Sequence, residues 1–310
     1  MNEYKIIEQT ISDIQILKIQ GATNTAFAAL GALKQFSQSL TGDLGIVKRK
    51  IEGAAYALAH ARPTEPFARN AMTFVLREIK DCVTVQEIKD TISRMVDKFV
   101  EIAQVSKNNL VKHGINALYD CHIIFSHCHS RTVERIIKAL HKKKKSIIVI
   151  ITETRPLFQG RLTAKALLEE GIETIMIVDD ACASFISDDT FLPVDAVVIG
   201  CDEFTIEGDL INKVGSLAIA LACKYAQKPL YVATTLLKLG TETLLSKPAI
   251  ELREGKEIWP DAPKGLKLIN PAFELVPSTL ITNYITEEGL VEPSSIYRTA
   301  IDRYPWLRIP

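Results

Sequence analysis

Two short polar segments contain residue types suited to proton transfer, and each follows an apolar run. Segment 125–130 (Phe-Ser-His-Cys-His-Ser) precedes a helical pattern, and segment 200–203 (Gly-Cys-Asp-Glu) follows the apolar run 196–199. We expect both segments to be turns at the carboxyl ends of parallel strands, where ligands bind and where a helix N-terminus offers N–H groups to an anion. Cys128 is therefore a candidate reactive thiol, and Asp202 is a candidate partner for it in acid-base chemistry.

The histidines and cysteines around Cys128 allow two other interpretations. A zinc cluster would draw its ligands from Cys121, His122, His127, Cys128 and His129. Side chains alternate between the two faces of a strand, and no second ligand pair has matching spacing, so the sequence favours no metal site. A buried structural cysteine is the other alternative for Cys128, and it stays open on the residues alone.

Several loops contain cations that suit a phosphorylated ligand. Arg62-Pro63-Thr64 and Thr154-Arg155-Pro156 each place an arginine before a proline, and Gln159-Gly160-Arg161 continues the second loop. The pair Asn212-Lys213 is expected at the opening of a helix near 212–226. Guanidinium forks match phosphate geometry, whereas a lone arginine more often forms a surface salt bridge. Together these loops favour a site for a small phosphate ester.

The hydrophobic periodicity predicts an α/β protein with two domains. Residues 1–115 show helical spacing of apolar residues, which predicts an all-helical N-terminal domain. In residues 116–310, short β-branched runs alternate with helical patterns, which predicts a doubly wound parallel sheet. Strands are expected at 117–125, 147–152, 173–178, 195–199 and 229–234. Helices are expected near 4–19, 22–38, 44–60, 67–79, 85–111, 131–142, 161–170, 212–226 and 294–303.

Composition excludes several functional classes. The 310 residues contain 37 basic and 37 acidic side chains, so no global field favours nucleic acid or an acidic membrane as partner. The six cysteines lack the spacing of a metal site or the density of a disulfide framework. No G-x-G-x-x-G or P-loop motif is present, so no nucleotide cofactor is indicated. With neither a signal peptide nor a membrane-spanning run, we expect a soluble cytoplasmic protein.

The motifs together resemble those of a known family. They occur in family order over nearly the whole chain: Ala61-Arg-Pro-Thr64, Ser126-His-Cys-His-Ser130, Thr152-Glu-Thr-Arg-Pro156, Gln159-Gly160, Gly200-Cys-Asp202, Ile211-Asn-Lys-Val-Gly215, Lys238 and Asn270-Pro-Ala-Phe273. The chain is similar to the family of archaeal ribose-1,5-bisphosphate isomerase, methylthioribose-1-phosphate isomerase and the alpha, beta and delta subunits of eukaryotic initiation factor 2B. This resemblance implies a Rossmann-like fold for the second domain.

The resemblance also implies functional roles. Cys128 and Asp202 match the catalytic residues of the isomerases, which the initiation-factor subunits lack. The implied substrate contacts are Gln20, Gly21, Ala22, Thr23, Arg62, Ser130, Arg131, Thr132, Asn212, Lys213 and Lys238. Gln20 departs from the family pattern, which has arginine there, and its amide would replace a charge-assisted contact at a cost of about 1.5–3 kcal/mol. No cofactor or metal is implied, and a homo-oligomer (dimer or hexamer) is expected.

The implied reaction is the conversion of ribose 1,5-bisphosphate to ribulose 1,5-bisphosphate. The residues after the cysteine resemble this enzyme more than the methylthioribose enzyme, which is the first alternative. Another aldose-1-phosphate isomerase is the second alternative, and a non-catalytic initiation factor 2B-like regulatory protein is the third. For the isomerase we expect Asp202 to be protonated by burial and Cys128 to be a thiolate stabilised by nearby positive charge.

Overall fold

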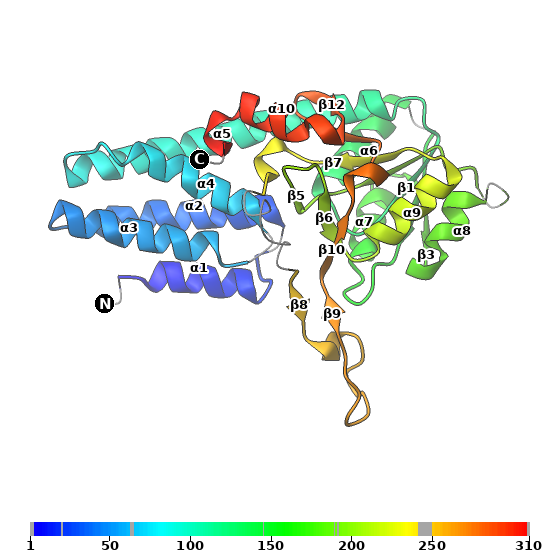
Figure 1. Cartoon of the computed structure of the whole chain (residues 1–310), viewed down its shortest axis with the longest axis horizontal. Helices are drawn as coiled ribbons and strands as arrows, with labels where there is room; N and C mark the ends of the chain where they lie inside the picture. The colour runs from blue at the N-terminus through cyan, green and yellow to red at the C-terminus, as the bar shows by residue number, and fades with distance from the viewer. Residues whose placement is uncertain are drawn as a thin grey trace.

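The protein consists of a helical part and a sheet-containing part that lie side by side (Figure 1). The computed structural model describes residues 3–19, 21–62, 65–144, 146–188, 190, 192–240 and 250–308. Within these ranges, none of the helices combines the length and the apolar composition needed to cross a bilayer.

Five helices form the N-terminal part, as the periodicity predicted. The longest, α5, begins with a capping box in which the Thr84 side chain and the Glu87 side chain each accept a backbone N–H of the other residue. The Asp43 side chain caps α3 by accepting the N–H of Ile46. The bounds are α1 Lys5–Gln15, α2 Ala22–Ser39, α3 Leu44–Ala59, α4 Pro66–Glu78 and α5 Val85–Ala117.

Helix α5 joins the two parts of the molecule. Its buried residues from Ile88 to Ala103 belong to the core cluster that includes the other N-terminal helices. Leu110 and Ile115, nearer its C-terminus, pack instead in a second cluster with one face of the sheet. The proposed boundary between residues 115 and 116 falls in the last turn of this helix. The division into two domains remains a prediction.

A seven-stranded sheet forms the centre of the second part. Its strand order is β12-β11-β7-β4-β1-β2-β3, and all neighbouring strands are parallel except the β11–β12 pair. The predicted parallel, doubly wound architecture is confirmed. The strands are β1 Ile123–Ser126, β2 Ile148–Thr152, β3 Glu173–Ile177, β4 Ala196–Ile199, β7 Leu230–Ala233, β11 Asn283–Thr286 and β12 Gly289–Val291.

The connections from β1 lead to β2 and β3 on one side, whereas β4 pairs with β1 on its other side. The strand order therefore reverses between β1 and β4. In open α/β sheets, ligands bind at the carboxyl ends of the strands beside such a reversal. The fold thus places the segments after β1 and β4 at the expected binding edge.

Helices cover the sheet and connect its strands. Helix α8 and strands β11 and β12 were not predicted, whereas the last helix was. The bounds are α6 Arg131–Lys144, α7 Gln159–Leu168, α8 Cys182–Ser187, α9 Ser216–Ala226 and α10 Ile296–Arg303. The 3₁₀ turns are η1 Asp179–Ala181, η2 Leu236–Lys238, η3 Gly255–Glu257, η4 Ser278–Leu280, η5 Pro293–Ser295 and η6 Pro305–Leu307.

Two predicted elements have different bounds in the structure. The expected strand 117–125 begins only at Ile123, because α5 continues to Ala117. A short apolar run does not distinguish a helix end from a strand. The expected helix 212–226 begins at Ser216, and residues 210–213 form strand β6 instead. Gly215, with φ 107°, makes the turn between that strand and α9.

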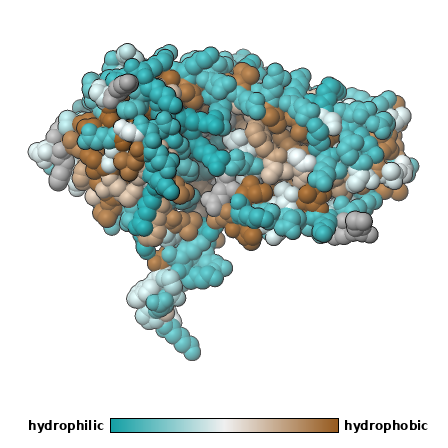
Figure 2. All heavy atoms as spheres, turned by 180° about the vertical axis from the view of Figure 1, so that it is seen from behind, coloured by the Kyte–Doolittle hydropathy of each residue, from teal (hydrophilic) through white to brown (hydrophobic). Residues whose placement is uncertain are grey.

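Two smaller sheets complete the fold. Strands β5 (Glu203–Phe204), β6 (Leu210–Lys213) and β10 (Phe273–Val276) form an antiparallel sheet in the order β10-β6-β5. Strands β8 (Leu252–Arg253) and β9 (Asn270–Pro271) form the base of an arm, residues 250–271, that projects from the body (Figure 1). From behind, the projecting arm is largely hydrophilic (Figure 2).

Candidate active site

Cys128 and Asp202 lie beside one cavity at the strand-order reversal. Cys128 follows β1 by two residues, and Asp202 follows β4 by three. Because β1 and β4 are adjacent parallel strands, their carboxyl ends bring both side chains to the same edge. The cavity there has a volume of about 530 Å³, and Cys128 and Asp202 both line it. This is an ordinary size for a small-molecule site.

The same cavity collects the other predicted ligand residues that the structure describes. They come from the start of α2, the start of α6, strand β6, turn η2 and the segment before α4. Gln20 lies outside the described residues, as do Pro63 and Thr64. The predicted residues in the cavity wall are Gly21, Ala22, Thr23, Arg62, Ser130, Arg131, Thr132, Asn212, Lys213 and Lys238.

Burial keeps the Cys128 thiol protonated. Cys128 has φ 63°, and its N–H donates to Thr154 Oγ1 at 3.0 Å. Its Sγ lies 3.6 Å from Gln159 Oε1, to which the thiol donates. Burial raises the pKa of Cys128 to about 12, although the charge of Lys213 acts in the opposite direction. The expectation of a resting thiolate is therefore wrong, because desolvation outweighs the nearby positive charge.

The pKa of Asp202 is shifted in the predicted direction. Burial raises its pKa above the ordinary value, although the charges of Lys238 and Lys213 lower it. Its backbone N–H donates to Ile211 O at 3.0 Å, which fixes the residue against β6. A carboxyl group that is kept neutral in an enclosed site is able to donate a proton.

His127 fixes the turn that carries Cys128. Its ring is 2% exposed, and burial lowers its pKa to about 4, so the ring is neutral. Nε2 donates to Val214 O at 2.9 Å, and Nδ1 therefore accepts from Thr152 Oγ1 at 2.6 Å. A Cβ on Gly215 would lie 2.9 Å from this ring. His127 thus ties β1 and β2 to the loop between β6 and α9.

His129 is also engaged by protein groups. Thr163 Oγ1 donates to Cys128 O, so His129 Nδ1 donates to Thr163 Oγ1 at 3.0 Å. Across the described part of the chain, no group of three His, Cys, Asp or Glu side chains is arranged to hold a metal ion. The histidines next to Cys128 support the turn structurally.

Two helix N-termini and several cations make the cavity attractive to anions. Helices α2 and α6 both begin at its wall, where Gly21 and Ser130 lie. Lys213 Nζ lies 4.9 Å from the centre of the Phe273 ring, and Lys238 Nζ donates to Cys201 O at 2.5 Å. Arg131 Nη1 donates to Asn24 Oδ1 at 2.9 Å. Helix N-termini and lysines or arginines at one wall are typical of phosphate sites.

Some sequence expectations for this site need correction. Asn212 and Lys213 reach the cavity from strand β6 rather than from the opening of a helix. Arg155 Nη2 donates to Ile258 O on the arm at 2.9 Å, and Arg161 Nη2 pairs with Glu153 at 3.0 Å. Neither arginine is part of the cavity wall. Each of these two guanidinium groups contacts a protein oxygen outside the cavity wall.

The cavity wall also contains residues that sequence reasoning did not select as ligands. Glu65 follows the Arg62 motif, and Gln159 belongs to a motif that had been noted, so proximity in sequence could have suggested both. Arg253 had no sequence signal, because it lies in a segment that was expected to be irregular. Leu157 and Leu162, which are partly exposed, add apolar surface.

Comparisons with known proteins identify the family of this chain. The family model "Initiation factor 2 subunit family" matches residues 18–293. Ribose 1,5-bisphosphate isomerase of Methanocaldococcus jannaschii is 33% identical, over 99% of this chain and 98% of that protein. Methylthioribose-1-phosphate isomerase of Thermoanaerobacter sp. (strain X514) is 29% identical, over 94% of this chain and 90% of that protein.

A solved structure supports the same fold. The crystal structure of the Pyrococcus horikoshii OT3 translation initiation factor eIF-2B has a TM-score of 0.80 at 24% identity, covering 93% of this chain and 97% of that chain. At this identity the likeness shows the fold alone. The family resemblance found in the motifs is confirmed by the match to the family model, and this chain belongs to the initiation factor 2 subunit family.

Proposed function

We propose that the protein is an aldose-ketose isomerase that converts ribose 1,5-bisphosphate to ribulose 1,5-bisphosphate. One observation carries this proposal: a thiol and a carboxyl whose pKa is raised by burial line the same cavity as two helix N-termini and several cations. The similarity to the isomerase of Methanocaldococcus jannaschii over nearly the whole of both chains supports the choice of substrate.

The substrate limits the chemistry. A sugar phosphorylated on its anomeric oxygen cannot open to a free aldehyde, so an acid must protonate the ring oxygen while the bond from C1 to that oxygen breaks. Removal of the C2 proton then leaves its electron pair between C1 and C2. A proton returned to C1 and loss of the O2 proton give the ketone. The reaction requires one group that donates a proton and one that accepts it.

We assign these roles to Asp202 and Cys128. Asp202, kept neutral by burial, donates to the ring oxygen and regains a proton from O2. Cys128 as thiolate removes the C2 proton and returns it to C1. Burial raises the pKa of both groups, so the pair must lose one proton before turnover. The charge of Lys213 favours that loss at Cys128.

The roles of the surrounding residues follow from their positions. The N-termini of α2 and α6, with Lys213, Lys238 and Arg62, would bind the phosphates and ring hydroxyls. A bisphosphate carries up to four negative charges, so several cations in one cavity suit it better than a monophosphate. Gln20 would contribute an uncharged amide to this set.

A second candidate is isomerisation of methylthioribose 1-phosphate. Leu157 and Leu162 provide apolar surface in the cavity that suits a methylthio group. The relative from Thermoanaerobacter also supports this reading. The two candidates share the acid-base pair and differ in the group at C5 of the sugar.

A phosphorus and proton NMR time course tests the proposal. The protein is incubated with each sugar phosphate in parallel with the variants Cys128→Ser and Asp202→Asn. Ribulose 1,5-bisphosphate should form with the unaltered chain, and each variant should be slower by about 10²–10⁴-fold. Turnover of methylthioribose 1-phosphate alone would select the second candidate. No turnover of either sugar would favour another aldose 1-phosphate or a non-catalytic regulatory role.

We also propose that the protein works in the cytoplasm as a homo-oligomer, a dimer or hexamer. All six cysteines are free thiols, which suits a reducing compartment. Light scattering coupled to size-exclusion chromatography would test the assembly, and a mass close to 34.4 kDa would refute it.

A further inference from the structure

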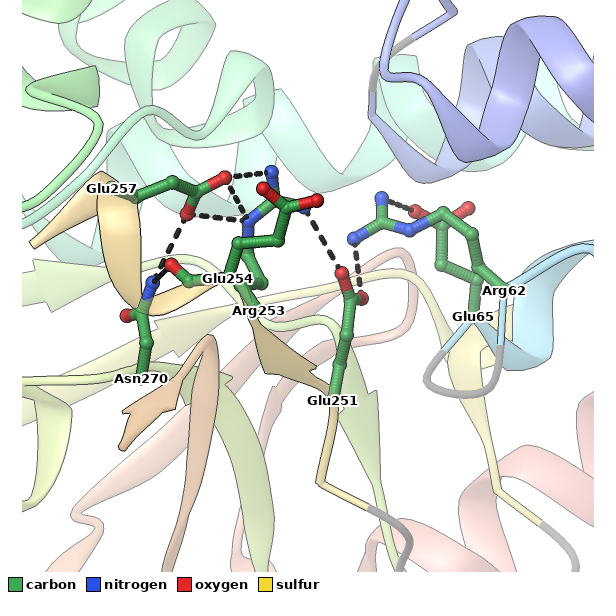
Figure 3. Close-up of polar contacts among 7 residues, drawn as sticks. All are labelled: Arg62, Glu65, Glu251, Arg253, Glu254, Glu257 and Asn270. Atoms are coloured by element: carbon green, nitrogen blue, oxygen red, sulfur yellow. Dashed lines mark hydrogen bonds and ion pairs between the residues drawn. The ribbon is translucent and has the colours of Figure 1, made fainter. Parts of the chain in front are cut away.

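One carboxylate bridges two arginines at the wall of the cavity (Figure 3). Glu251 Oε2 lies 2.9 Å from Arg62 Nη2, and Glu251 Oε1 lies 3.2 Å from Arg253 Nη1. Both arginines line the cavity. Arg62 comes from the segment before α4 and Arg253 from the base of the arm, so segments far apart in the chain meet here.

Each guanidinium is held by a further carboxylate on its other side. Arg62 Nη1 pairs with Glu65 Oε1 at 2.5 Å. Arg253 pairs with Glu257 through Nε and Nη2, and Asn270 Nδ2 donates to the same carboxylate at 3.1 Å (Figure 3). Both arginine side chains are less than one-fifth exposed. The two guanidinium groups would therefore keep their positions if Glu251 left.

The bridged position lies within electrostatic range of the reacting carboxyl. The charge of Arg62 lowers the pKa of Asp202, and the charge of Glu251 raises it. An anion at the place of the Glu251 carboxylate would thus lie at the wall of the cavity, between two arginines that line it. Each guanidinium presents one nitrogen to the Glu251 carboxylate, Nη2 of Arg62 and Nη1 of Arg253. Two guanidinium groups that face a single oxyanion are a strong arrangement for a phosphate group.

We propose that Arg62 and Arg253 form the binding site of one substrate phosphate and that the Glu251 carboxylate occupies this site until the phosphate displaces it. The inference rests on the proposed function for the identity of the ligand as a sugar bisphosphate. A phosphate dianion offers three oxygens and twice the charge of a carboxylate, so it competes well for both guanidinium groups. Glu251 lies at the base of the projecting arm, and its side chain is 17% exposed.

Displacement makes a quantitative prediction for phosphate binding. If Glu251 occupies the site most of the time, the apparent affinity is lowered by the fraction of molecules in which the site is free. Glu251→Gln removes the competing charge, so inorganic phosphate should bind about tenfold more tightly. Arg253→Gln should bind phosphate at least about tenfold more weakly, because a charge-assisted contact is lost. Arg253→Lys keeps the charge without the fork and should be intermediate.

Glu254→Gln is the matched control. Glu254 lies on the same arm, its side chain pairs with exposed Lys256, and it is 66% exposed. Its substitution removes the same charge and leaves the Arg62–Glu251–Arg253 bridge intact. Isothermal titration calorimetry with inorganic phosphate, at fixed pH and ionic strength, should therefore give the same affinity for Glu254→Gln as for the unaltered chain. Circular dichroism melting checks that each variant is folded.

The double variant Glu251→Gln/Arg253→Gln separates displacement from a general charge effect. If Glu251 competes for the Arg62–Arg253 site, Glu251→Gln should increase phosphate affinity much less when Arg253 is also substituted. Equal affinities for Glu251→Gln, Glu254→Gln and the unaltered chain would overturn the inference and identify the bridge as a fixed structural ion pair. Unchanged phosphate binding in Arg253→Gln would also overturn it.

The titration needs no turnover, so its outcome is distinct from that of the function. Tighter phosphate binding in Glu251→Gln, in a protein that isomerises neither sugar, would support the phosphate site and refute the proposed reaction. Turnover of ribose 1,5-bisphosphate with no change in phosphate affinity in either variant would support the reaction and refute this site.

Discussion

His127 should make the stability of this protein depend on pH in a predictable way. Burial lowers its pKa from 6.5 to about 4. Between these pH values the His127 ring binds a proton in the unfolded chain but not in the folded protein, so the free energy of unfolding falls as the pH falls. The contribution of the neutral His127 ring to the free energy of unfolding is fully present above pH 6.5 and is lost as the pH falls toward 4. A difference of about 2.5 pKa units corresponds to about 3 kcal/mol in total, of which about 2 kcal/mol is lost by pH 5.

His127→Gln removes the titration and keeps an amide that can donate to Val214 O. We expect the variant to be less stable at pH 8 by about 1 kcal/mol, because the bond from Thr152 is altered. Urea unfolding of both proteins between pH 4.5 and pH 8 gives the two free-energy curves. Groups other than His127 contribute equally to both curves, so the difference in the free energy of unfolding between the two proteins should shrink or change sign as the pH falls. Parallel curves across this range would refute the assignment of a buried neutral ring.

Three further predictions follow from the site and its supports. The thiol of Cys128 should react with iodoacetamide at pH 8 about a thousandfold more slowly than an ordinary cysteine, because its pKa is raised from 9.0 to about 12. Labelling followed by mass spectrometry measures the rate, and fast labelling would contradict a neutral thiol. Turnover requires the pair of Cys128 and Asp202 to have lost one proton, and the raised pKa of Cys128, about 12, delays loss of the second. The value of kcat/KM should therefore not decline between pH 7 and pH 9.5, and a decline in this range would argue against this pair. Gly160→Ala should lower the free energy of unfolding by about 1–3 kcal/mol or more, because the added Cβ would lie 1.8 Å from Thr152 O. Gly53→Ala is the control: the position has open space around it in α3, so alanine should raise the free energy of unfolding by up to about 1 kcal/mol. Thermal melts measure both changes.

The principal features of the fold could be predicted from the sequence. Period-3.6 apolar spacing identified the five N-terminal helices, and the β-branched runs identified the strands of the parallel sheet apart from β11 and β12. Parallel strands end at a common edge, so the positions of Cys128 and Asp202 after two such runs were enough to predict that they meet. The strands around Asn283 and Gly289 were missed because short strands without strict alternation carry a weak signal.

The protonation state of the site was decided by the tertiary structure. The sequence places positive residues near Cys128, which by itself suggests a thiolate, but burial raises the pKa of the thiol. For Asp202 the same desolvation raises the pKa, which is the direction that was expected. Desolvation depends on atoms from every segment around the cavity, so no local pattern reports its size.

The choice of partners for the cations was also made only by the fold. From the sequence, Arg62 and Arg155 look equivalent, since each precedes a proline. In the structure Arg155 contacts the arm, whereas Arg62 reaches the cavity and shares Glu251 with Arg253. Residues 62 and 253 are far apart in the chain and meet because both pair with Glu251 at the base of the arm. Local spacing determined which residues could bind a phosphate, and long-range packing determined which of them face the cavity, because side-chain contacts across the chain depend on the tertiary arrangement.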